Sequence, residues 1–141
     1  MSRIDQQLDY LGSIPLFSSC TKKELKTLQS LCERVDVPAG KELVKQGTTG
    51  FECFVLVSGT AEVSINGRMV TSLGPGAYFG ELALLDKQPR SATVTTSSAC
   101  SLLVLGPRQF STALESYPGM AQKMLAGLAQ RLREANARIA I

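Results

Sequence analysis

Short β-prone runs separated by turn residues fill the middle of the chain, from residue 34 to residue 106. The clearest turn is Asn66-Gly67, because a type I′ hairpin turn needs a positive φ angle at both central positions. The run before it, residues 60–65, alternates apolar and polar side chains, and residues 69–73 can pair back on it. Strands this short, with turns at such close intervals, favour a mainly β fold. We expect an antiparallel β-roll or jelly-roll barrel over residues 34–106.

Helical periodicity replaces the β pattern at both ends of the chain. Thr21 and Glu24 have capping-box spacing and precede leucines at helical intervals. Pro107 suits a first helical turn, and a second helix is expected from Pro118. That last helix is long and carries one apolar stripe, made of Ala121, Met124, Leu125, Leu128 and Leu132. We expect one domain over residues 1–141, with an N-terminal helical part over 1–33 and C-terminal helices over 107–141.

Composition excludes several classes of protein. The net charge is only +3 and Lys and Arg are scattered, so no dense basic face indicates direct DNA binding by these residues. Because these residues end at Ile141, soon after the long helix, we expect no helix-turn-helix among them. No apolar run is long enough to cross a bilayer and no signal peptide is visible, which predicts a cytoplasmic protein outside the membrane.

Catalytic and metal chemistry find little support in the sequence. There is no histidine, the commonest general base, and no nucleophile elbow or Walker loop, so we expect no enzyme activity. The four cysteines have no metal-binding spacing, and we expect them to be free thiols without a metal or cofactor; they are Cys20, Cys32, Cys53 and Cys100.

Residues 78–96 concentrate the groups that suit a ligand. Gly80 lets the backbone approach closely, and it opens a short helical run whose first N–H groups favour an anion. Arg90, just after the helix-stopping Pro89, offers a planar fork of donors that fits a phosphate. Glu81 would be repelled by that phosphate, so it must face a neutral donor such as a sugar hydroxyl. A ligand with one phosphate and a nearby ribose hydroxyl meets all three demands.

This segment resembles the phosphate-binding cassette of the cyclic nucleotide-binding domain family, whose pattern is Phe-Gly-Glu-Leu-Ala, a variable turn, and Pro-Arg-x-Ala. The residues that match are Phe79, Gly80, Glu81, Leu82, Ala83, Pro89, Arg90 and Ala92. The resemblance implies that Glu81 holds the ribose 2′-hydroxyl and Arg90 the cyclic phosphate. It also implies phosphate bonds from backbone N–H groups near Gly80, Leu82, Ala83 and Ala92.

The resemblance also bears on the nucleotide and on the last helix. A Thr after the arginine accompanies cGMP in this family, whereas Ala or Ser occurs with cAMP, so Ser91 favours cAMP and leaves cGMP open. The family uses its final helix to cover the base, which makes Arg131, Leu132 and Arg133 candidates for that cap. The alternative is that the apolar stripe is core or a helix-pairing surface, for a homodimer or an effector protein.

The predicted function is therefore a cyclic nucleotide sensor, most readily for cAMP, that signals by ligand-driven closure of its last helix. Three alternatives stay open. The chain can be the regulatory part of a transcription regulator, the regulatory part of a larger effector, or a module of the same fold that mediates interactions without binding nucleotide.

Overall fold

The computed structural model describes residues 3–138, so residues 1, 2 and 139–141 of the predicted terminal helices lie outside the described residues. The chain forms two compact units. One is helical and contains the described residues up to Leu31 and from Gln109 onward; the other is the β unit, Cys32–Arg108. Whether the two units unfold together as a single domain, as the sequence suggests, stays a prediction.

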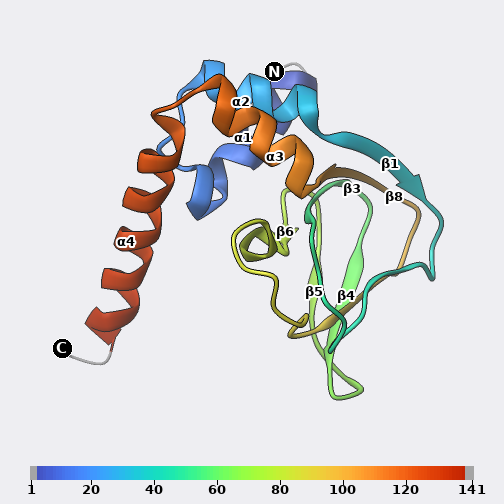
Figure 1. Ribbon diagram of the computed structural model, residues 1–141. Helices are drawn as coiled ribbons and strands as arrows, with labels where there is room; N and C mark the ends of the chain where they lie inside the picture. Colours follow the sequence, from blue (N-terminus) through green and yellow to red (C-terminus); the bar gives the residue numbers. More distant parts are fainter. Residues whose placement is uncertain (1–2, 139–141) are drawn as a thin grey trace. The chain divides into compact units, whose positions relative to one another are not determined.

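The β unit consists of two four-stranded antiparallel sheets, which confirms the predicted mainly β fold (Figure 1). The first sheet has the strand order β1 (Glu33–Val37), β8 (Cys100–Leu105), β3 (Cys53–Ser58) and β6 (Tyr78–Phe79). The second has the order β2 (Glu42–Val44), β7 (Thr93–Thr96), β4 (Ala61–Ile65) and β5 (Arg68–Leu73).

The core of the β unit lies between these two sheets. Alternate residues of β8 face it, because side chains along a strand point in turn to opposite faces. The buried cluster comprises Phe54, Leu56, Cys100, Leu102 and Val104, and residues of both sheets pack against it: Val35, Val37, Leu43, Val44, Leu73 and Phe79. All six residues of β8 are buried, so this strand has no solvent-exposed face.

The hairpin predicted at Asn66-Gly67 is present and joins β4 to β5. Asn66 has a φ of 53° and Gly67 a φ of 79°, as a type I′ turn requires. The side chain of Gln46 holds the turn from outside. Its amide nitrogen donates to the Asn66 side chain (3.1 Å) and its oxygen accepts from the Asn66 N–H (2.8 Å).

The helical unit contains α1 (Arg3–Ser13), the 3₁₀ turn η1 (Pro15–Phe17), α2 (Lys22–Leu31), α3 (Pro107–Ser116), whose first two residues belong to the β unit, and α4 (Met120–Arg138). The sequence did not predict η1, and α4 begins two residues after the expected start at Pro118. The unit has its own core, in which Leu11, Phe17, Leu28 and Met120 are at most 1% exposed. Phe17 packs against Phe110, with ring centroids 6.4 Å apart.

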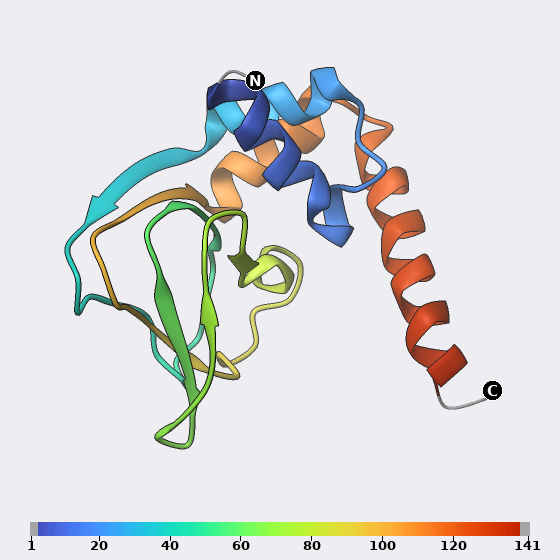
Figure 2. The same ribbon diagram turned by 180° about the vertical axis from the view of Figure 1, so that it is seen from behind.

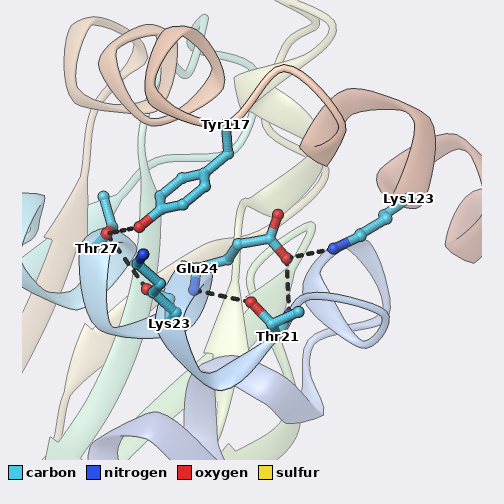
Figure 3. A network of polar contacts seen from close by, with 6 residues as sticks. All are labelled: Thr21, Lys23, Glu24, Thr27, Tyr117 and Lys123. Atoms are coloured by element: carbon cyan, nitrogen blue, oxygen red, sulfur yellow. Dashed lines mark hydrogen bonds and ion pairs between the residues drawn. The ribbon is translucent and has the colours of Figure 1, made fainter.

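A polar network joins α2 to α4 inside the helical unit (Figure 3). The predicted capping box is present, since the Thr21 N–H donates to Glu24 (2.7 Å) and the Glu24 N–H donates to Thr21 Oγ1 (3.2 Å). The same Glu24 carboxylate accepts from Lys123 Nζ at 2.7 Å. Helix α2 also contacts the segment between α3 and α4, where the Tyr117 hydroxyl lies 3.1 Å from Thr27 Oγ1.

Among the helices that the structure describes, none combines the length and the apolar character needed to cross a membrane.

Candidate functional site

The segment predicted to bind a ligand forms a compact turn of the β unit after β6 (Figure 2). Gly80 adopts the left-handed conformation, with a φ of 78° and a ψ of 13°, which strongly favours glycine here. The run that follows is a 3₁₀ helix, η2 (Glu81–Leu84). Pro89 ends the turn by forming an isolated antiparallel bridge with Thr49, so the chain reaches Arg90 beside the loop between β2 and β3.

This turn encloses a pocket of about 320 Å³. Six predicted site residues line it together: Gly80, Glu81, Leu82, Ala83, Arg90 and Ser91. Pro89 lines it too, as do Asp86 and Gln88, which the sequence reasoning did not single out. The sequence offered one indication for Asp86 and Gln88: both lie in the variable turn between Glu81 and Arg90, the two residues predicted to bind the ligand. The acid, the guanidinium and the glycine-opened turn thus share one cavity.

Two predicted residues do not line this pocket. Phe79 stacks on Phe54 with ring centroids 4.9 Å apart and an interplanar angle of 12°, so its side chain packs against the core between the two sheets. Ala92 lies directly before β7, beyond the residues that form the pocket wall. Neither placement tests whether the backbone at these positions contacts a ligand, and that role stays a prediction.

Glu81 is the first residue of η2 and is only 8% exposed. Ala83, also predicted to offer its N–H to a phosphate, donates to the Gly80 carbonyl at 3.1 Å. A phosphate that uses the Ala83 donor would therefore share it with the turn.

Arg90 is held in a defined position. Its Nη2 donates to the Glu52 carbonyl at 3.0 Å, and its guanidinium lies over the Phe54 ring, 5.9 Å from the centroid. Burial lowers the pKa of the Arg90 guanidinium, while Glu52 acts in the opposite direction. Because arginine deprotonates only above about pH 12 in water, the side chain stays charged at neutral pH.

Arg90 also lines a second cavity of about 260 Å³, together with residues of β2, of the β2–β3 loop and of β3. Sequence reasoning missed this loop as part of the site. The only local signal was the pair of glycines, Gly47 and Gly50, which read as an ordinary turn.

The candidate cap residues lie in the helical unit. Arg131, Leu132 and Arg133 are in the second half of α4 and all are exposed, Leu132 at 63%. Which of them covers a base stays a prediction.

No group of three or more His, Cys, Asp or Glu side chains within residues 3–138 is arranged to hold a metal ion. All four cysteines are free. Burial raises the pKa of Cys20 to about 11 and that of Cys32 to about 12, so both are protonated thiols at neutral pH.

Comparison with known proteins connects this geometry to a family. Residues 34–117 match the family model described as "Cyclic nucleotide-binding domain". Among curated proteins, the Pycsar effector protein XpPycTIR of Xanthomonas perforans is 34% identical over 110 residues, which are 77% of this chain and 36% of that protein. The matched region therefore spans about a third of the length of that relative.

Solved structures agree with the fold. The N-terminal domain of a transcriptional regulator from Streptomyces coelicolor superposes with a TM-score of 0.83 at 31% identity, covering 92% of this chain and 94% of that one. The regulatory domain of Toxoplasma gondii PKA, crystallised with cAMP, gives a TM-score of 0.70 at 36% identity. That match covers 79% of this chain and 44% of the other.

Proposed function

Because the chain belongs to the cyclic nucleotide-binding domain family, we propose that its pocket binds a cyclic nucleotide, cAMP in preference to cGMP. The observation that carries this proposal is that Glu81 and Arg90, nine residues apart in the sequence, line one pocket opened by the left-handed Gly80. The related PKA regulatory domain crystallised with cAMP supports the choice of ligand.

In this proposal each group of the pocket meets the part of the ligand that its chemistry suits. The Arg90 guanidinium donates to the cyclic phosphate, and a charge-assisted pair of this kind is stronger than a neutral hydrogen bond. The Glu81 carboxylate accepts from the ribose 2′-hydroxyl. N–H groups of the turn at Gly80, Leu82 and Ala83, and that of Ala92, add donors to the phosphate. Ser91 lies at the pocket wall, where it can contact the base.

Signalling in this proposal is a shift of population between an open and a closed state. Ligand in the pocket favours a movement of residues 107–117 that brings α4 over the base, with Arg131, Leu132 or Arg133 as the cap. The ligand can drive this change only by the amount that it prefers the closed state. The domain thus acts by binding and has no catalytic step of its own.

Calorimetric titration of the wild-type chain with cAMP, cGMP and AMP tests the ligand. We expect cAMP to bind most tightly and AMP to bind much more weakly, because its open phosphate carries more charge and lacks the ring that fixes phosphate and 2′-hydroxyl together. Equal affinity for AMP and cAMP would contradict recognition of the cyclic phosphate. No binding of either cyclic nucleotide would leave the alternative of an interaction module.

The output of such a sensor is proposed to lie in a partner. The relatives compared above include an effector protein and the N-terminal domain of a transcriptional regulator, which supports a longer protein or a second chain as the recipient of the signal. Because Lys and Arg are scattered along the sequence and the net charge is only +3, direct DNA binding by these residues is not part of the proposal.

We further propose that α4 pairs with α4 of a second copy. Leu125 and Leu132 are 66% and 63% exposed, and with Leu128 they follow the alternating three- and four-residue spacing of a coiled-coil seam. Replacing Leu125 and Leu132 by Gln should shift a dimer to monomer in sedimentation experiments, because the seam loses its apolar contacts. Gln122→Ser, on an exposed position of the same helix, serves as the control, and a monomeric wild type would contradict the pairing.

A further inference from the structure

Gly50 lies where the side chain of Arg90 passes. A methyl group added to Gly50 would overlap Nε and Cζ of Arg90 and would come within 2.7 Å of its Cδ. These contacts fall along the middle and outer part of the arginine side chain. The arginine therefore occupies the volume that any side chain at position 50 would need.

A second glycine borders the arginine. A methyl group on Gly80 would overlap Arg90 Nη1 and would lie 2.7 Å from the Glu52 carbonyl oxygen. Gly80 also has a left-handed φ of 78°, a backbone conformation that by itself favours glycine at this position. Gly50 has no such requirement, because its φ lies outside the left-handed region. What Gly50 supplies is space.

The loop that contains Gly50 also holds the backbone of Arg90. The Arg90 N–H donates to the Thr48 carbonyl at 2.8 Å, and the Arg90 carbonyl accepts from the Gly47 N–H at 2.8 Å. The side chain then donates to the Glu52 carbonyl at 3.0 Å. Residues 47–52 thus hold both the backbone and the guanidinium of Arg90. Gly50 leaves room for the side-chain atoms between them, Cδ, Nε and Cζ.

We propose that Gly50 is a positioning residue for the phosphate-binding arginine, because its missing side chain keeps open the channel that directs Arg90 into the pocket. This proposal rests on the proposed function, in which Arg90 binds the cyclic phosphate. A methyl group at position 50 must displace either the loop or the arginine. The loop is buried at Gly50. Before Gly50 it is bonded to the Arg90 backbone through Gly47 and Thr48, and after it the chain enters β3 at Cys53, whereas the arginine side chain can rotate. The arginine should therefore move and the fold should remain.

The test compares Gly50→Ala with Gly74→Ala. Gly74 has open space around its Cβ position and no left-handed φ, so alanine fits there without a clash. For Gly50→Ala we expect affinity for cAMP, measured by calorimetry, to fall about tenfold or more, as when a charge-assisted hydrogen bond is lost. The thermal midpoint should stay close to that of the wild type. Gly74→Ala should leave both quantities unchanged.

Two further measurements separate positioning from general damage. In the ligand-free protein, the NMR signal of the Arg90 Nε–H should shift in Gly50→Ala and stay in place in Gly74→Ala. In an Arg90→Ala background, Gly50→Ala should cost little more affinity, because the displaced group is already gone. A merely structural role for Gly50 would instead give additive losses and a lower thermal midpoint.

The outcomes distinguish this proposal from the proposed function. Wild-type affinity and an unmoved Arg90 signal in Gly50→Ala, with Arg90→Ala weakened, would overturn the positioning role alone. Undiminished affinity in Arg90→Ala would overturn the assignment of the pocket, and with it the reason for positioning the arginine.

Discussion

Replacing Arg90 with alanine should weaken cAMP binding by about ten- to a hundredfold, equivalent to roughly 1.5–3 kcal/mol. The side chain enters the pocket partly buried and already oriented by the Glu52 carbonyl, so little freedom remains to be lost when the phosphate binds. Among the residues that the structure describes, Arg90 is the one arginine that lines this pocket, so its removal takes away that guanidinium. Isothermal calorimetry at fixed ionic strength measures the change.

Matched variants make the Arg90 result specific. Arg90→Lys keeps the charge but loses the planar fork, so its loss should be smaller than that of alanine. Glu81→Ala should also weaken binding, through the ribose hydroxyl. Arg68→Ala removes an exposed arginine of β5 outside the pocket and should have no effect. If Arg68→Ala weakened cAMP binding as much as Arg90→Ala, Arg90 would act only through its net charge and not through direct contact with the phosphate.

Replacing Glu24 with glutamine should lower the free energy of unfolding by about 1 kcal/mol at neutral pH, because the Lys123 side chain is 38% exposed and water can partly replace the lost partner. The Glu24 residue is 4% exposed and accepts from both Lys123 and Thr21, so the variant leaves Lys123 without its charged partner (Figure 3). Chemical denaturation measures the loss. Glu115→Gln, at an exposed position of α3, is the control and should be near neutral.

The stabilising effect of Glu24 should depend on pH. Burial works to raise the pKa of this carboxyl, but hydrogen bonds from Lys123 and Thr21 outweigh it and the pKa is lowered. A carboxyl whose pKa is lower in the folded state contributes its stability above its ordinary pKa, about 4.3, and loses it as pH falls through the folded value. The difference between wild type and Glu24→Gln should therefore be constant near pH 7 and shrink below about pH 4. A difference that did not change down to pH 2 would contradict this linkage.

Features encoded within a few residues were predicted correctly. The Asn66-Gly67 turn follows from the φ angles that these two residues tolerate, and the capping box follows from hydrogen bonds between Thr21 and Glu24, three residues apart. Pro107 begins α3 as expected. The short helical run after Gly80 is present and is a 3₁₀ helix. In each case the determining contacts lie within one turn of chain.

Contacts between distant residues could not be predicted in this way. The sequence placed Phe79 in the binding motif but did not show that the pairing of β6 with β3 stacks its ring on Phe54, in the core between the two sheets. Lys123 reaches Glu24 across 99 residues because helix packing in the tertiary structure brings α4 beside α2. No local pattern at either lysine or glutamate reveals the partner.

The local sequence therefore determined the turns, the caps, the strand pattern and the chemistry of the cassette, since each depends on backbone angles and on side chains close along the chain. Only the tertiary structure decided that Gly50 borders Arg90, because the bridge between Thr49 and Pro89 brings together two loops 40 residues apart. Pairing of this kind is fixed by the collective burial of both sheets. A single segment does not contain that information.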